Sequence, residues 1–401
     1  MSISPTKLLV YDQPHQFEPL LPQKRLGELV EATADIVERS HRLQAAVSPA
    51  ARDALREVVR SMNSYYSNSI EGQGTHPLNI ERALRDDFSA KPEIAQRQRI
   101  ALAHIQAESE LEQQNATAAV ALGSGFLMQA HAAMYKRLSE ADRSIAGGHV
   151  AEPGKIRDKD VTVGRHQPPT ASSLPLFLKR MDEVYGRLQG LDAMLYTIAA
   201  AHHRAAWVHP FLDGNGRAMR LQTHCALHPL SGGLWSVNRG LARKRDKYYE
   251  LLSNADMPRH GDLDGRGNLS EKMLWAWCRF FIELCSDQVS FMAQMLDLDR
   301  MKERIRGLVI VRSHMADRDY REEAVLPLQH VLLAGPVSRG EFAQMTGLGE
   351  RTARKLISCL VADGLLVSDT PRGNVRLGLP LDALNHLLPN LYPEAAAAPM
   401  E

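Results

Sequence analysis

The stretch His209–Arg220 constrains this chain more than any other, and it reads His-Pro-Phe-Leu-Asp-Gly-Asn-Gly-Arg-Ala-Met-Arg. Two glycines flank an asparagine immediately before a predicted helix, so successive backbone N–H groups can converge on an anion there. Arg217 and Arg220 are three residues apart and share one side of the first helical turn, where their guanidinium groups can bind phosphates. Asp213 offers a hard ligand for Mg²⁺, and the imidazole of His209 can accept a proton from a hydroxyl. The combination predicts a site for phosphoryl or nucleotidyl transfer.

Each part of this stretch has a simpler explanation when it is taken alone. A lone histidine at a helix end is more often structural than catalytic, and Gly-Asn-Gly is more often only a turn. The prediction therefore depends on the combination of these residues and on their order.

The composition limits the class of protein. With 401 residues, the chain is expected to form two or three domains. Its 48 basic and 47 acidic residues leave a formal net charge of +1, so nucleic acid or an anionic membrane would have to bind a local patch. The first seven residues lack the apolar run of a signal peptide, and no stretch reaches the roughly 20 apolar residues of a membrane span. We expect a cytoplasmic protein without a membrane partner.

The four cysteines point to the same compartment. They lie in apolar, helix-like stretches and lack the paired spacing of metal ligands. We expect them to be small buried hydrophobes in a reducing environment. These residues are Cys225, Cys278, Cys285 and Cys359.

Helical periodicity dominates the chain, which predicts a mainly α fold. Apolar residues recur at helical spacing from Leu26, and Ser48 with Pro49 begins a second helix that runs towards Ile70. Further helices are predicted in residues 78–137, from residue 174 to His209, and in residues 221–227 and 273–295, with a loop at residues 229–233.

Residues 144–170 break the helical pattern. Their glycines and prolines exclude a helix, and Val161-Thr162-Val163 offers a short strand. We predict a β-hairpin or loop that carries alternating basic residues, Lys155, Arg157, Lys159 and Arg165. This segment is either an exposed basic loop or a lid or docking edge beside a site.

The helix that begins after Ser48 ends with an unfavourable charge. Glu71 lies where the helix dipole is already negative, and the preceding basic residue, Arg60, is about three turns away. Glu71 is therefore either a solvated end residue or the partner of a cation from elsewhere in the fold.

Residues 324–380 are predicted to form a separate module. A helix at residues 325–333 is followed by a short helix capped by Ser338, a tight turn, a basic-faced helix at residues 350–360 and two short strands. This order is typical of a winged helix-turn-helix. Residues 338–380 carry six basic and four acidic side chains, a weak excess for DNA, so a module for protein contacts or dimerisation fits equally well.

The stretch His209–Arg220 resembles the signature of Fic-domain proteins, H-P-F-x-D-G-N-G-R-x-x-R, at every fixed position. Residues 153–169 look like the flap of that family, the hairpin that holds a target segment by β-pairing. Ser67–Gly72 matches the family's inhibitory-helix motif, S/T-x-x-x-E-G/N. The resemblance extends over residues 40–300. It implies that the target docks on Val161, Thr162, Val163 and Gly164.

The resemblance implies a protein adenylyltransferase, which transfers AMP from ATP to a Ser, Thr or Tyr hydroxyl of a target protein or of itself. His209 would then be the base and Asp213 the Mg²⁺ ligand. Glu71, in its motif with Ser67, would form a salt bridge with Arg220 and displace the γ-phosphate, so that the resting enzyme is inhibited. The nucleotide-binding residues would be Gly214, Asn215, Gly216, Arg217, Ala218, Met219, Arg220, Tyr248 and Tyr249.

Two positions of the nucleotide pocket are open to other interpretations. Tyr248 and Tyr249 resemble the aromatic pair that walls the adenine in the family, but they also fit ordinary core tyrosines. Seven residues beyond Tyr249, where some relatives carry an asparagine near the base, this chain has Asp256.

The same fold also supports other reactions. Members of the family transfer UMP, phosphate or phosphocholine, although the intact Gly-Asn-Gly-Arg sequence disfavours phosphate transfer here. Removal of AMP from a modified target is compatible with an intact Glu71. A regulator that binds DNA through residues 338–380 is the alternative from a different functional class, and a homodimer is the assembly that the family suggests.

Three regions are expected along the chain. Residues 1–120 form an N-terminal helical region with the inhibitory helix at about residues 50–72. Residues 121–300 form the catalytic domain, and residues 318–395 form the C-terminal module. The predicted fold is therefore mainly α, a Fic-type helical core with a β-hairpin flap, followed by a small α+β winged-helix domain.

Overall fold

Helices make up most of residues 10–145, 148–315 and 319–395, which are the residues that this computed structural model describes. The prediction of a mainly α fold is confirmed. Among the described residues, the strands form only two short antiparallel hairpins. β1 (Ser144–Ile145) pairs with β2 (His149–Val150), and β3 (Leu366–Val367) pairs with β4 (Arg376–Leu377). The first seven residues lie outside the described part of the chain, and no described helix combines the length and apolarity needed to cross a bilayer.

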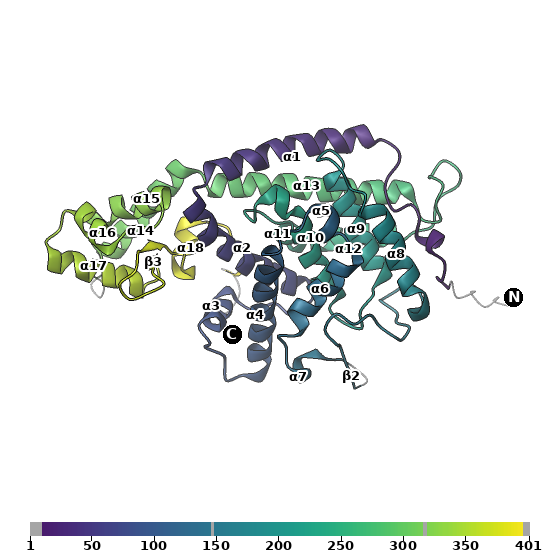
Figure 1. The fold of residues 1–401 in the computed structure, drawn as a ribbon, viewed down its shortest axis with the longest axis horizontal. Coiled ribbons are helices and arrows are strands. Elements are labelled where there is room, and N and C mark those ends of the chain that lie inside the picture. Colours follow the sequence, from purple (N-terminus) through teal and green to yellow (C-terminus); the bar gives the residue numbers. More distant parts are fainter. Residues whose placement is uncertain (1–9, 146–147, 316–318, 396–401) are drawn as a thin grey trace.

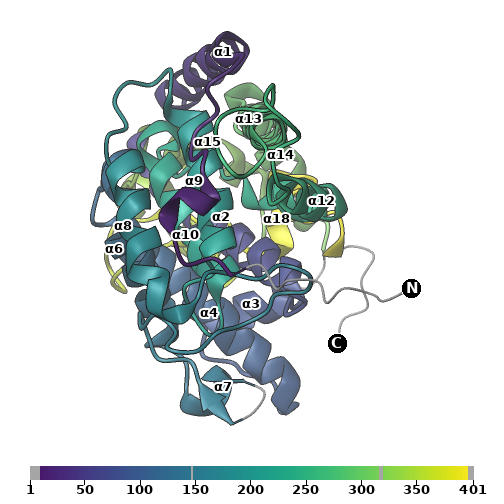
Figure 2. The same ribbon diagram turned by 90° about the vertical axis from the view of Figure 1, so that its right-hand side faces the viewer.

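The half of the molecule that contains the motif His209–Arg220 is built around α10 (Asn215–Ser231), whose residues are almost all buried. It packs against α9 (Met194–Val208), α6 (Ser124–Tyr135) and α4 (Pro92–Glu112). Viewed along the long axis, α9, α10 and α2 lie within the bundle, and α1 lies at its margin (Figure 2). Because α10 begins inside the motif His209–Arg220, the motif is carried by a helix that is buried among its neighbours.

Two long helices cover one face of this bundle. α1 (Leu26–Ala46) and α13 (Glu271–Met295) run side by side along the upper edge (Figure 1). The remaining elements of the chain, in order, are η1 (Pro14–Phe17), α3 (Pro77–Leu84), α5 (Ala118–Ala121), α7 (Glu140–Arg143), η2 (Ala171–Ser173), α8 (Leu174–Tyr185), α11 (Asn238–Arg243), α12 (Arg245–Ala255), α14 (Leu298–Ser313), η3 (Glu322–Ala324), α15 (Val325–Ala334), α16 (Arg339–Thr346), α17 (Glu350–Ala362) and α18 (Leu381–Leu387).

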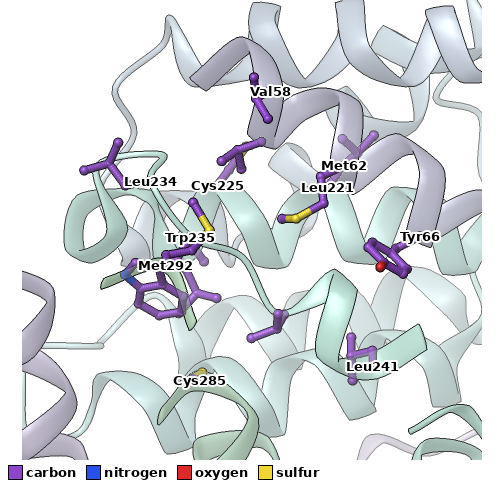
Figure 3. Close-up of a cluster of buried hydrophobic side chains, with 14 of the residues drawn as sticks. Val58, Met62, Tyr66, Leu221, Cys225, Leu234, Trp235, Leu241, Cys285 and Met292 are labelled. Atoms are coloured by element: carbon purple, nitrogen blue, oxygen red, sulfur yellow. The ribbon is translucent and has the colours of Figure 1, made fainter. Parts of the chain in front are cut away.

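α2 (Pro49–Ile70) begins and ends as the sequence predicts. The Ser48 side chain accepts a hydrogen bond from the backbone N–H of Ala51, and Pro49 occupies the first turn. Gly72 has a positive φ of 73°, as expected for a residue that ends a helix. The apolar face of α2, with Val58, Met62 and Tyr66, packs towards α10, α11 and α13 (Figure 3). This packing fixes the position of the helix whose end carries Glu71.

One helix boundary differs from the prediction. The sequence predicts a loop at residues 229–233, but in the structure α10 continues through Pro229 to Ser231. Pro229 lies in the last turn, where a missing N–H removes a single hydrogen bond. The helix ends instead at Gly232, whose φ of 58° supplies the left-handed conformation of a helix stop. The region predicted as helical at residues 78–137 is divided into α3, α4, α5 and α6.

Three of the four cysteines are buried, as the sequence predicts. Cys225, Cys278 and Cys285 are buried, and burial raises the pKa of each of these thiols. Cys359 is only half-buried, on α17. No disulfide joins the described cysteines, which fits the expectation of small apolar residues.

The C-terminal helices gather at one end of the molecule (Figure 1). α15, α16, α17, β3 and β4 follow one another in the order expected from the sequence. Ser338 and Glu341 form a reciprocal capping box at the start of α16, and Gly347 ends that helix with a φ of 67°. α14 and α18 pack against one another beside these elements. The assignment of this region as a winged helix-turn-helix domain stays a prediction.

Candidate active site

The motif His209–Arg220 forms a closed loop between α9 and α10. His209 follows the last residue of α9 with a positive φ of 49°, and Gly214 precedes α10 with a φ of 75°. The Asn215 side chain donates to the carbonyl of Phe211 and accepts from its N–H, both at 2.8 Å. Phe211 itself is fully buried. The side chain of Asn215 therefore holds the loop closed, and the backbone N–H groups of the Gly-Asn-Gly segment stay available to bind an anion.

The two glycines of the motif are also required by close packing. A Cβ atom on Gly214 would overlap the hydroxyl of Tyr135, and a Cβ atom on Gly216 would overlap the carboxylate of Glu71. Glu71 thus lies directly on the start of α10. The sequence motif alone gives no sign of either contact.

Arg220 is the centre of an ion pair with the end of α2. Its Nη2 donates to Oε1 of Glu71 at 2.6 Å and to the carbonyl of Ser67 at 3.1 Å, and its Nε donates to Oγ of Ser67 at 2.9 Å. The Arg220 side chain is 1% exposed. Burial alone would raise the pKa of Glu71, but the charge of Arg220 and its hydrogen bond lower that pKa below its ordinary value. Glu71 is therefore a carboxylate, and its cation comes from a distant segment.

Arg217 and Asp213 form a second polar group beside this pair. The Tyr135 hydroxyl donates to Oδ2 of Asp213 at 2.6 Å, and Arg217 donates to the same oxygen at 3.1 Å. Arg217 also donates to the Tyr135 hydroxyl at 2.7 Å and to the side chain of Gln73 at 2.6 Å. Burial would raise the pKa of Asp213, but Arg217 and Tyr135 lower it. Asp213 is a carboxylate whose side chain is 41% exposed. It is therefore suited to bind a Mg²⁺ ion whose other ligands include phosphate oxygens.

A cavity of about 850 Å³ opens over the motif. Predicted site residues that line it are Glu71, Val163, His209, Asn215, Gly216, Met219, Arg220, Tyr248 and Tyr249. Its volume is within the range of pockets that hold nucleotide-sized ligands. The other predicted residues lie outside this lining: Ser67, Val161, Thr162, Gly164, Asp213, Gly214, Arg217 and Ala218.

His209 stands on the wall of this cavity as a neutral imidazole. Burial is the main cause that lowers the pKa of His209 to about 4, and the neighbouring His166 and Arg157 contribute in the same direction. A neutral ring keeps a lone pair at neutral pH, as a general base requires. The geometry therefore gives His209 the protonation state that the sequence-based role demands.

Arg157 corrects the prediction of an exposed basic loop. Lys155, Lys159 and Arg165 are exposed, but Arg157 is 2% exposed. Its Nε donates to the carbonyl of His209 at 2.9 Å, and its backbone N–H donates to the carbonyl of Pro210 at 2.8 Å. The guanidinium is thus used inside the fold, because it satisfies backbone carbonyls at the turn that positions His209.

The predicted strand at Val161–Val163 is also corrected. The structure forms a single antiparallel bridge between Val163 and His166, around a tight turn at Gly164 with a φ of 59°. The hairpin cannot lengthen on its C-terminal arm, because Pro168 and Pro169 follow and a proline has no N–H to donate. Thr162, Val163 and Gly164 are exposed and Val161 is half-buried, so this edge is accessible beside the cavity.

The two tyrosines of α12 differ from each other. Tyr248 is 1% exposed, and its hydroxyl lies 3.0 Å from Nε2 of His202 in the core. Tyr249 is 43% exposed, and its hydroxyl donates to the carbonyl of Ile70 at 3.2 Å. Both line the cavity, so Tyr248 combines the core role and the pocket role that the sequence left open. Asp256 also lines the cavity, 3.0 Å from Nε2 of His203.

Two residues of α6 support the motif and were not foreseen. Nδ1 of His131 accepts from the N–H of Gly154, so its Nε2 carries the proton that bonds the carbonyl of Asp213 at 3.1 Å. The ring of His131 stacks between Tyr135 and Phe211, with centroids 4.1 and 4.0 Å away. His131 thereby joins the base of the flap to the loop. No short sequence pattern links these residues, because they meet only in the folded chain.

A buried group on α4 and α10 was also missed. Ligand-type atoms of Glu108, Glu112 and His224 lie within 4.8 Å of one another. Glu112 is paired with Arg60 at 2.7 Å and with His224 at 2.7 Å, and Glu108 accepts from Asn63 at 2.8 Å. These charges neutralise one another inside the helix interface. We therefore assign the group to the packing of α2, α4 and α10.

The sequence model of the Fic/DOC family matches residues 121–227, which include the whole motif. This chain carries a Fic domain. The predicted resemblance to Fic-domain proteins is thereby confirmed for residues 121–227, which include the loop, α9 and most of α10. The inhibitory helix and the C-terminal winged helix stay predictions.

Curated relatives of this Fic-domain protein carry the name "Protein adenylyltransferase Fic". The protein from Nematostella vectensis is 29% identical over 206 residues, which are 50% of this chain and 43% of that protein. The protein from Drosophila erecta is 27% identical over 240 residues, which are 59% of this chain and 44% of that protein. The chain spans less than half the length of these relatives.

A solved structure has the same fold over nearly all of its length. It is a Fic family protein from Desulfovibrio desulfuricans G20, which is 18% identical, covers 92% of this chain and 98% of its own, and aligns with a TM-score of 0.50. The prediction of a Fic-type helical fold is confirmed.

Neutral buried histidines should make the stability of this fold depend on pH. Burial is the main cause that lowers the pKa of His104 to about 3 and that of His209 and His228 to about 4. Below pH 6.5 the unfolded chain binds protons at these positions and the folded chain does not, so the free energy of unfolding falls as the pH falls. The pKa values of Glu108 and His224 are raised, so these two groups act in the opposite direction, but they are outnumbered by the histidines with lowered pKa values.

We expect urea denaturation at pH 7, 6 and 5 to show a steady loss of stability. In His209→Asn the loss should be smaller by about 1–2 kcal/mol, because one titrating imidazole is absent. Equal losses in both proteins would show that His209 is not a neutral buried group in the native state.

Proposed function

We propose that this protein transfers AMP from ATP to a Ser, Thr or Tyr hydroxyl of a target protein, and that Glu71 inhibits the reaction. One observation carries the proposal: a neutral His209, the backbone nest of the motif and the guanidinium of Arg220 border one cavity of nucleotide size. The names of the curated relatives support the same activity. The described cysteines form no disulfide, which fits a reducing compartment, and we place the reaction in the cytoplasm.

In the proposed reaction, His209 removes the proton from the target hydroxyl as its oxygen attacks the α-phosphorus of ATP. The new bond joins that oxygen to phosphorus, and the bond from the α-phosphorus to the bridging oxygen breaks, so pyrophosphate leaves with the bonding electrons. The backbone N–H groups of Gly214–Gly216 would bind phosphate oxygens, and Arg217 and Arg220 would bind the β- and γ-phosphates. Mg²⁺, held by Asp213, would supply positive charge beside the phosphates.

The flap is proposed to hold the target. The exposed edge at Val161–Gly164 lies beside the cavity that His209 lines, so an extended target segment paired with it would present its hydroxyl near the imidazole. A hydroxyl of the chain itself could occupy the same place, which makes self-modification a convenient readout.

The proposed inhibition follows from competition for Arg220. Glu71 and the γ-phosphate are both anions, and a buried guanidinium that holds one carboxylate at 2.6 Å cannot hold a phosphate in the same position. ATP would then bind with its phosphates displaced from in-line attack, and transfer would be slow.

Glu71→Gly should raise self-labelling by ATP that carries its label on the α-phosphate. We expect an increase of roughly 10²-fold, because misalignment of reacting groups commonly costs that much in rate. Glu71→Gln, which keeps the size but not the charge, should give a smaller increase. Parallel reactions with α-labelled UTP identify the nucleotide, and an unchanged rate in Glu71→Gly would remove inhibition from the account.

His209→Ala in the Glu71→Gly background should abolish labelling while the protein still binds ATP. The expected loss is about 10²–10⁴-fold, the usual contribution of a general base. The dissociation constant for ATP, measured by calorimetry, should change little, because the phosphates are bound by other residues. Transfer that persists at the rate of the Glu71→Gly parent would refute the role of His209.

A second function, DNA binding, is favoured by one observation in the C-terminal region. The side chains of Arg351, Arg354 and Lys355 are all exposed on α17, the second helix of the helix-turn-helix order. We propose that this face contacts phosphates of the protein's own upstream DNA, so that a catalytic and a regulatory function coexist in one chain.

Replacing Arg351 and Arg354 together by alanine should weaken binding to that DNA. The slope of log K against log salt concentration should become shallower by about 2, because two phosphate contacts are lost. Arg306→Ala on α14 removes an exposed arginine outside α17 and serves as the control. If the double variant binds as tightly as the parent at every salt concentration, α17 does not read DNA.

A further inference from the structure

The last described residues of the chain, 388–395, lie against the end of α2 and are here called the terminal segment. The Tyr66 hydroxyl is within 2.9 Å of the carbonyl of Leu391 and 2.9 Å of Oε2 of Glu394. The ring of Tyr392 is nearly perpendicular to that of Tyr65 at 5.3 Å and stacks towards Tyr66 at 6.3 Å. Tyr392 is 8% exposed, so this contact is a packed interface.

The terminal segment is also fixed on its other side. Arg239 on α11 donates to the carbonyl of Asn390 at 3.0 Å, and Arg243 pairs with Glu394 at 2.9 Å. The segment therefore contacts both α2 and α11. It also follows directly from α18, which packs on α14 in the C-terminal region.

This contact lies on α2 close to the two residues, Ser67 and Glu71, that bind Arg220. Tyr66 immediately precedes Ser67, whose hydroxyl and carbonyl both accept from Arg220. Glu71 follows only five residues after Tyr66, about 7 Å along the helix axis. A displacement of the Tyr66 turn would therefore move both groups that hold Arg220.

The end of α2 needs such external support. Its last turn contains no basic residue, and Glu71 is a carboxylate at the negative end of the helix dipole. The isolated helix end would tend to fray, since its last carbonyls have no intrahelical partners. Tertiary contacts must hold this turn in place, and the terminal segment contributes contacts at Tyr65 and Tyr66, directly before it.

We propose that the terminal segment is a regulatory latch, which holds the last turns of α2 so that Glu71 stays on Arg220, and through which the C-terminal region controls the active site. The inference rests on the proposed inhibition by Glu71. A ligand that shifts α18, on which the segment depends, would withdraw Tyr392 from Tyr65 and Tyr66. The end of α2 would loosen, Glu71 would leave Arg220, and the γ-phosphate could take its place.

The latch is tested with Tyr392→Ala in the full-length chain. Self-labelling should rise at least about fivefold, the lower end of typical coupling between distant sites. In the Glu71→Gly background the same substitution should have no further effect, because the inhibitory carboxylate is already absent. Glu283→Ala is the control, since it breaks an exposed ion pair of α13 with Arg279 at 2.9 Å and lies on neither α2 nor α18. That control should leave labelling unchanged.

A second measurement is independent of catalysis. Hydrogen exchange of the amides in residues 66–71 should be faster in Tyr392→Ala than in the parent, and unchanged in Glu283→Ala. Glu394→Ala and Tyr66→Phe remove only the polar contacts and should give the same effect at smaller size. These two variants decide the matter if Tyr392→Ala does not fold.

The outcomes separate the latch from the proposed function. If Glu71→Gly labels nothing but residues 66–71 exchange faster in Tyr392→Ala, the transferase proposal fails and the latch remains. If Glu71→Gly is active while the latch variants change neither labelling nor exchange at residues 66–71, the latch is overturned. Equal activation by Tyr392→Ala with and without Glu71 would overturn it as well.

Discussion

The ion pair between Arg220 and Glu71 is the interaction on which the rest of the site depends. An arginine that is 1% exposed requires a counter-charge, because an unpaired charge in such a place costs several kcal/mol. Glu71 supplies that charge in the structure, with two further hydrogen bonds from Arg220 to Ser67. In the proposed reaction the γ-phosphate would supply it instead. The same physical need, neutralisation of one guanidinium, therefore produces both the resting state and the proposed productive state.

The surroundings of His209 follow a related principle, in which burial sets the charge. A pKa of about 4 leaves the imidazole neutral, and the nearby guanidinium of Arg157 favours the same state. Arg157 contributes in a second way, since its Nε donates a hydrogen bond to the backbone carbonyl of His209. A histidine with a positive φ of 49° is uncommon, and such backbone persists only where neighbouring contacts fix it. The flap thus positions the candidate base as well as the edge on which a target would dock.

The sequence allowed the motif, the start and end of α2, and the order of the C-terminal elements to be predicted, because each depends on local signals. Ser48, Pro49 and Gly72 are residues whose conformational preferences act within one turn of a helix. The partner of Glu71 could be named only through the family resemblance, since 149 residues separate it from Arg220. His131, Tyr135 and Arg157 escaped prediction for the same reason. Each acts through contacts that exist only after distant segments have packed. For Arg157, the pattern of alternating basic residues allowed either an exposed loop or a lid, and neither predicted a buried guanidinium.

The length of α2 explains how distant parts of the chain can act on one carboxylate. A helix is stiff along its axis, so a constraint at any turn limits the motion of the turns beside it. Ser48, at the start of α2, donates to the carbonyl of Leu332 in α15, and Tyr66, near its end, bonds the terminal segment. The C-terminal region therefore contacts α2 near both ends, while the middle of the helix is fixed in the hydrophobic core (Figure 3). Only the last turn, where Glu71 lies, has weak intrinsic support, and it is there that a small change in packing can alter the competition for Arg220.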